Sequence, residues 1–235
     1  MRPARPVVTV LVVRDGPQGP EVLVRQRAES SAERSRLVLP GGAPEEEDAD
    51  VCDWFGPSPK QWARRLDVSH VRVARQYVMA AVRTLFEETS LLLAGTGEDD
   101  VVPDPHTPLW SAGRSSLETG AEGLPSQLAR RGLGVRTDLL HPVTRWVSPA
   151  EDDRRVDAWI FAVSVPPGQQ PVGRDGAACR DEENCPGGLQ WMPAVTLDED
   201  AGLQCSSMVR AAVDCVVRSS CAAGFLLGLS ARADS

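Results

Sequence analysis

The chain has few aromatic residues, almost no lysine and no long apolar run. Aromatic side chains make up 5% of its 235 residues, and Lys60 is the sole lysine, so nearly every strong base is arginine. The apolar run Val7–Val13 ends at Arg14 without a small-residue cleavage site, and the run Ala222–Leu229 is far shorter than the ~20 residues of a membrane span. We therefore expect neither a signal peptide nor a membrane partner, and a cytoplasmic protein.

An excess of acidic residues restricts the partners further. The chain has 25 Lys+Arg and 33 Asp+Glu, a formal net charge of −8. General affinity for nucleic-acid phosphate requires the opposite sign, so we expect no nucleic-acid partner. If such a protein handles phosphates, it does so locally, through a few arginines or a bound cation.

Six cysteines raise the question of a zinc site or a disulfide framework. Cys52 stands alone, and the pairs Cys179/Cys185 and Cys215/Cys221 lack the C-x2-C spacing of a structural zinc site. Without an export signal, reduced thiols are the default state. We predict neither a structural zinc nor a framework of disulfides.

Hydrophobic periodicity predicts an alternation of strands and helices. The expected strands cover residues 7–13, 21–27, 37–39, 145–148, 158–165 and 189–192, and short helices cover 125–132 and 206–218. Segments rich in Pro, Gly, Asp and Ser, residues 95–120 and 166–188, are expected to be loops.

A longer helix is predicted from Val71 onward. Its apolar stripe has three- and four-residue spacing and comprises Val71, Ala74, Val78, Ala81, Val82 and Leu85. On the opposite side, Arg83/Glu87 and Thr84/Glu88 are i,i+4 pairs that share one face. Taken alone, this pattern is typical of a solvated, salt-bridged surface.

Together with Pro40-Gly41-Gly42, this helix resembles the Nudix box, G-x5-E-x7-R-E-U-x-E-E-x-G-U, where U is a bulky aliphatic residue. Gly42 takes the place of the first glycine and Asp48 that of the first acid, whereas counting from Gly41 puts Glu47 there. The matching helix positions are Arg83, Leu85, Glu87, Glu88 and Leu91.

Three departures from the box accompany these matches. Thr84 stands where the box has a glutamate, and Ser90 replaces the glycine that supplies a left-handed helix end. An insertion of about residues 43–70 separates the first acid from Arg83. Such an insertion is similar to that of the coenzyme A diphosphatase branch of the Nudix superfamily and its actinobacterial relatives.

The resemblance implies one Nudix-like domain over residues 1–235, an α/β/α sandwich with a mixed, curved sheet. It further implies hydrolysis of a small molecule that contains a diphosphate, possible homodimerisation, and Mg2+ or Mn2+ held by Glu87 and Glu88. These two residues and Arg83 would form the catalytic group, with Arg83 orienting a carboxylate by ion pairing. Gly41 and Gly42 would shape a phosphate-binding loop, since glycine permits positive φ and close backbone approach.

Several alternatives stay open from the sequence. The substrate could be coenzyme A or an acyl-coenzyme A; the chain could instead bind a diphosphate without hydrolysing it, or be a biosynthetic enzyme with a rebuilt pocket. Further metal ligands could come from Glu47, Asp48, Glu182 or Glu183. Because the helix face that carries Thr84 is predicted to be polar, we expect folding to tolerate Thr84→Glu.

Overall fold

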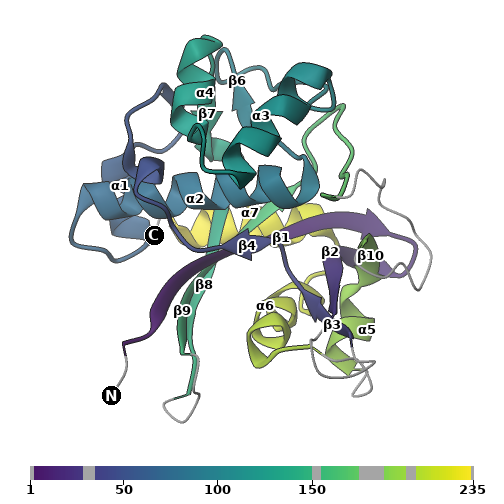
Figure 1. Ribbon diagram of the computed structural model, residues 1–235. Coiled ribbons are helices and arrows are strands. Elements are labelled where there is room, and N and C mark those ends of the chain that lie inside the picture. Colours follow the sequence, from purple (N-terminus) through teal and green to yellow (C-terminus); the bar gives the residue numbers. More distant parts are fainter. Residues whose placement is uncertain (1–2, 29–34, 150–154, 175–187, 200–204, 234–235) are drawn as a thin grey trace.

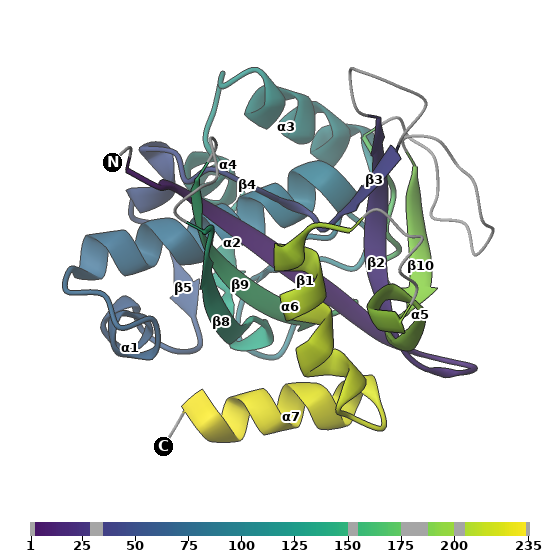
Figure 2. The same cartoon turned by 90° about the horizontal axis from the view of Figure 1, so that it is seen from below.

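A mixed sheet crosses the middle of the molecule, with helices on both faces (Figures 1 and 2). The computed structural model describes residues 3–28, 35–149, 155–174, 188–199 and 205–233. The strands of the sheet are β1 Arg5–Gly16, β2 Gly19–Ala28, β3 Ser35–Val38, β4 Gly41–Gly42, β8 His141–Val147, β9 Val156–Ser164 and β10 Leu189–Pro193. Their order is β10-β2-β1-β9-β8, with β3 paired to β2 and β4 to β1. β1 and β9 are parallel and the other pairs antiparallel, which makes the sheet mixed.

Alternation of apolar residues along the central strands builds two cores, one on each face of the sheet. In β1, Val10 and Val12 face one core, whereas Leu11 and Val13 face the other. The first face is covered by α1 Pro59–Arg65, α2 Val71–Thr89, α3 Pro108–Glu118 and α4 Leu124–Arg130. The second is covered by α5 Ala194–Glu199, α6 Ser207–Val217 and α7 Ala222–Ala233. The predicted α/β/α sandwich is confirmed.

The segment inserted between the glycines and α2 is folded onto the first core. It contains the 3-10 helix η1 Glu47–Ala49, the strand β5 Trp54–Phe55 and α1, whose Trp62 is fully buried against Phe161. β5 pairs with β7 Gly134–Arg136, which also pairs with β6 Ala94–Gly95 to make a second, small sheet. A second 3-10 helix, η2 Thr137–Leu139, follows β7 directly.

The long helix α2 begins at Val71, as predicted, and its C-terminal half is buried on every side. Each residue from Val78 to Thr89 is buried, the charged ones included. The sequence pattern indicated a solvated surface opposite the apolar stripe, and this interpretation is wrong. The inserted segment and β4 cover that face, a contact that helical periodicity does not reveal.

Four helices of the described chain were not predicted: α1, α3, α5 and α7. α3 lies inside the segment 95–120 that was expected to be a loop; its Ser- and Gly-rich sequence buries mainly Trp110 and Leu117. α7 packs Phe225 and Leu229 against the second core. No single helix among the described residues is long and apolar enough to cross a membrane; α6 and α7 reach that length only together, across a bend of 98°.

The four cysteines in the described part of the chain, Cys52, Cys205, Cys215 and Cys221, are free thiols. Cys179 and Cys185 lie outside the described residues. Burial raises the pKa of Cys52 to about 11, an effect that the charge of Asp53 reinforces and that of Arg75 opposes.

Cys52 should therefore be unreactive at mildly alkaline pH. A rise of two pKa units reduces the thiolate, the reactive species, about 100-fold at pH 8. Peptide mapping by mass spectrometry after a timed iodoacetamide pulse should show Cys52 labelled far more slowly in the folded chain than in urea. Equal labelling rates in both states would contradict this.

Candidate functional site

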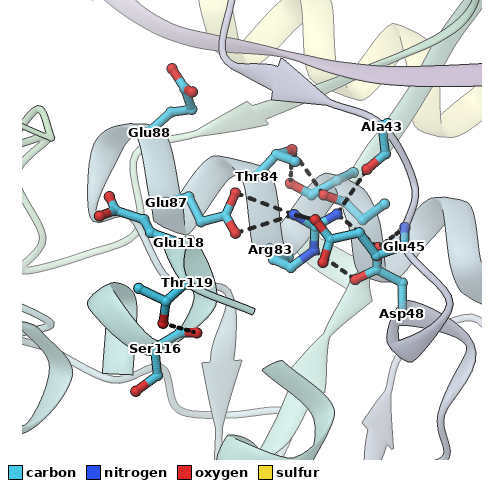
Figure 3. A network of polar contacts seen from close by, with 12 residues as sticks. Ala43, Glu45, Asp48, Arg83, Thr84, Glu87, Glu88, Ser116, Glu118 and Thr119 are labelled. Atoms are coloured by element: carbon cyan, nitrogen blue, oxygen red, sulfur yellow. Dashed lines mark hydrogen bonds and ion pairs between the residues drawn. The ribbon is translucent and has the colours of Figure 1, made fainter. Parts of the chain in front are cut away.

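Arg83 lies at the centre of a buried cluster of carboxylates (Figure 3). Its Nε and Nη2 donate to the two oxygens of Asp48 at 2.8 and 2.9 Å. Nη2 also donates to the Ala43 carbonyl at 2.9 Å, and Nη1 donates to both oxygens of Glu87 at 3.2 Å. Glu45 completes the cluster at 3.2 Å from Nη1. Arg83 thus forms ion pairs with three carboxylates, and its predicted role in the catalytic group stays a prediction.

The structure distinguishes the two candidates for the first acid of the box. Asp48 is 1% exposed and also accepts from the backbone N–H of Glu45 at 2.8 Å. Glu47, one residue earlier in η1, is exposed to solvent. Asp48 is therefore the partner of Arg83, and both of its oxygens are engaged in holding the inserted segment.

Burial and pairing shift the pKa values of this cluster in ways that follow from its charges. Burial by itself lowers the pKa of Arg83, but the hydrogen bonds and charges of Asp48, Glu87 and Glu45 outweigh it and raise the pKa above its ordinary value. Burial raises the pKa of Glu87, which Arg83 and Arg174 only partly offset. The Arg83 guanidinium thus stays charged at every pH the protein meets, whereas burial disfavours the charged form of its partner Glu87.

Glu87 and Glu88 are each 6% exposed and are surrounded by arginines. Glu88 lies between Arg25 of β2, at 3.0 Å, and Arg174, at 3.1 Å. Arg174 also approaches Glu87 at 3.7 Å. Arg25 and Arg174 were not among the predicted site residues, because strand β2 and the segment after β9 come together with α2 only in the folded chain.

Thr84 is 1% exposed, and its hydroxyl donates to the Ala80 carbonyl one turn earlier at 2.8 Å. Its methyl group faces Gly42, so that a Cβ at Gly42 would lie 2.8 Å from Thr84 Cγ2. The expectation that folding tolerates Thr84→Glu because this face is polar is wrong, since a longer, charged side chain would enter a filled, buried space.

The two glycines of β4 are required by contacts within the protein. Gly41 and Gly42 pair with Thr9 and Val8 of β1, and neither has positive φ, in contrast to the prediction. A Cβ on Gly41 would collide with the Val8 carbonyl oxygen. The close neighbours of these glycines are β1 and Thr84, and their predicted contact with phosphate stays a prediction.

At the end of α2, Ser90 takes the left-handed conformation that the box assigns to glycine, with φ 60°. Its hydroxyl donates to the Val172 carbonyl at 3.0 Å and accepts from Arg114 of α3. A pocket of about 410 Å³ opens here. Its lining includes Ser90, His106, Trp110, Arg114, Glu118 and Arg174.

Arg174 connects this pocket with the acidic pair, since it also lies 3.9 Å from Glu118 of α3. Carboxylate oxygens are the ligands that Mg2+ and Mn2+ prefer, and Glu87 and Glu88 offer them side by side. Within the described ranges, no group of three or more Asp, Glu, His or Cys side chains is placed to hold a metal ion. Glu182 and Glu183, two of the candidate ligands, lie outside the described residues. The pair thus fits part of a cation site.

Comparison with known proteins bears on the fold. No protein-family profile and no curated protein matches the sequence. The structure is similar to that of a Nudix hydrolase from Alicyclobacillus acidocaldarius, with a TM-score of 0.70, 23% identity, and coverage of 98% of this chain and 97% of that one. The Nudix hydrolase RenU from M. smegmatis matches with a TM-score of 0.40 and 13% identity over 91% and 84% of the two chains. The first comparison shows that the chain has the Nudix fold.

The pairing of Asp48 with Arg83 should be a large contribution to stability. Asp48→Asn leaves the buried guanidinium without one counter-charge, and breaking a buried pair destabilises by about 3 kcal/mol or more. Glu47→Gln, one residue away and exposed, should change the free energy of unfolding by less than about 0.5 kcal/mol. Urea denaturation of both variants measures the difference, and equal effects would remove Asp48 from its assigned role.

The contact between Gly42 and Thr84 predicts a compensating pair of substitutions. Gly42→Ala should lower the free energy of unfolding by about 1–3 kcal/mol, because its methyl group overpacks against Thr84. Thr84→Ser removes the opposing methyl and should restore most of that loss in the double variant. Gly41→Ala meets backbone, so Thr84→Ser should not rescue it; rescue of both, or of neither, would show that the contact is misassigned.

Proposed function

We propose that the chain hydrolyses a small molecule containing a diphosphate, with Mg2+ or Mn2+ as cofactor. The observation that carries this proposal is the buried pair Glu87 and Glu88, adjacent on α2 and connected through Arg174 to a pocket. Burial of two neighbouring carboxylates is unfavourable unless they meet positive charge, so their presence on a Nudix fold is consistent with the binding of a cation.

Within this proposal each residue has a distinct task. Glu87 and Glu88 would hold the cation, which would neutralise charge on the diphosphate and acidify the attacking water. Arg83 touches no substrate; it keeps Glu87 oriented and joins it, through Asp48, to the segment that follows β4. Gly41 and Gly42 hold β4 against β1, and the half-buried backbone of β4 would approach phosphate oxygens.

Coenzyme A or an acyl-coenzyme A is the substrate we propose to test first. Its support is the sequence resemblance, in particular the segment inserted between the glycines and Arg83. That segment is a packed part of the fold, since β5 and α1 contact the small sheet and α2.

Binding without hydrolysis is the second candidate, and the surroundings of Thr84 favour it. Its hydroxyl donates to the Ala80 carbonyl, and its methyl group fills the space beside Gly42. This position therefore offers no carboxylate to a metal ion or a water molecule. Arg25 and Arg174 already neutralise Glu88, which reduces its demand for a cation.

Phosphomonoester release from a panel of diphosphates tests the proposal. The panel comprises coenzyme A, an acyl-coenzyme A and a nucleoside diphosphate sugar, each with Mg2+ and with Mn2+. Glu88→Gln should lower kcat/KM at least about 100-fold, the scale of a positioned catalytic group. Asp214→Asn, on α6 at the opposite face of the sheet, should leave it unchanged. Saturable binding by calorimetry without product from any compound would favour the second candidate.

A further inference from the structure

Three arginines surround the acidic pair, but they approach it from different sides. Arg83 comes from α2 itself and contacts Glu87, and Arg25 comes from strand β2 and contacts Glu88. Their side chains are 4% and 23% exposed. Arg174 differs: it contacts both carboxylates of the pair, and its side chain is 43% exposed. Arg174 is therefore the positive charge on the solvent side of the pair.

The backbone that carries Arg174 is fixed to the end of α2. The Val172 N–H donates to the Thr89 carbonyl at 2.8 Å, and the Val172 carbonyl accepts from Ser90 Oγ at 3.0 Å. Arg114 of α3 donates to the Gly173 carbonyl at 2.9 Å. Because the backbone is fixed and the side chain is half-exposed, Arg174 can move away from the two carboxylates by rotation of its side chain alone.

One of these contacts depends on the hydroxyl of Ser90, the residue that replaces the glycine of the box. A glycine would take the left-handed conformation with less strain but would have no hydroxyl to hold Val172. The departure from the box therefore serves to place the backbone next to Arg174.

We propose that Arg174 is a built-in competitor for the divalent cation: its guanidinium occupies the solvent side of Glu87 and Glu88, where the cation would bind. This inference rests on the proposed role of Glu87 and Glu88 as metal ligands. Arg174 and a cation cannot use the same carboxylate oxygens together, because like charges a few ångströms apart repel even near the surface. The pocket lined by Arg174 offers it another position, since phosphate oxygens there would accept from the same guanidinium. Arg174 thus keeps the affinity for the divalent cation low as long as no phosphate ligand occupies the pocket.

Binding of Mn2+ alone to the full-length chain, followed by the electron paramagnetic resonance signal of free Mn2+, tests this proposal without any assay of turnover. Arg174→Gln removes the charge and should tighten Mn2+ binding at least about tenfold. Arg174→Lys keeps a positive charge at this position and should stay within about threefold of the wild type. Arg174→Ala provides the same test if the glutamine variant does not fold, as checked by circular dichroism.

Arg130→Gln is the matched control, since it neutralises an exposed arginine of α4 that pairs with Glu122. It should bind Mn2+ like the wild type, and Arg174→Gln combined with Glu88→Gln should lose the gain. No gain in Arg174→Gln, an equal gain in Arg130→Gln, or a gain that survives Glu88→Gln would each overturn the proposal.

The outcome is separable from that of the proposed hydrolysis. A gain in Mn2+ affinity without turnover of any diphosphate supports the role of Arg174 and overturns the hydrolase. Turnover that depends on Glu88, without a gain in the Mn2+ affinity of Arg174→Gln, supports the hydrolase and overturns the role of Arg174.

Discussion

The buried guanidinium of Arg83 is the interaction on which the arrangement of the site depends. A charge that is 3% exposed requires compensation, and Asp48, Glu87 and Glu45 supply it. Asp48 belongs to the inserted segment and Glu87 to α2, so this single side chain ties a long excursion of the chain back to the helix. The donation to the Ala43 carbonyl fixes the exit from β4 in the same way. Removing the charge would release three parts of the fold together.

Thr84 and Ser90, two of the departures from the Nudix box pattern, have structural roles of their own. Thr84 closes the space beside Gly42 with a methyl group and satisfies its hydroxyl within α2. Ser90 accepts a strained left-handed backbone and in return holds the segment that carries Arg174. The helix position where the box has a glutamate carries no carboxylate in this chain, and arginines contact Glu87 and Glu88. The net charge of the site is thus less negative than the box pattern implies. For this reason both hydrolysis and binding without hydrolysis are proposed.

Similarity of fold does not decide between these functions. The same sandwich can carry different chemistry, because function resides in particular side chains and in what they contact. Here the relevant contacts are those of Glu88, which lies between Arg25 and Arg174 at nearly equal distances. One arginine is on the central sheet and the other at the rim of a pocket. Whether Glu87 and Glu88 bind a cation depends on how readily the Arg174 side chain moves away from them.

The sequence by itself predicted every strand of the large sheet except β4, and the start of α2 at Val71, because periodicity is a local property. Motif spacing, also local, singled out Arg83, Glu87 and Glu88 as site residues, which stays a prediction. It left the first acid undecided, since only the turn of η1 directs Asp48 inward and Glu47 to solvent. The burial of the charged face, the filled space at Thr84 and the contacts of Arg25 and Arg174 were decided by tertiary structure. These contacts join residues far apart in the chain, and no periodic pattern records which of them meet when the sheet, the inserted segment and α2 pack together.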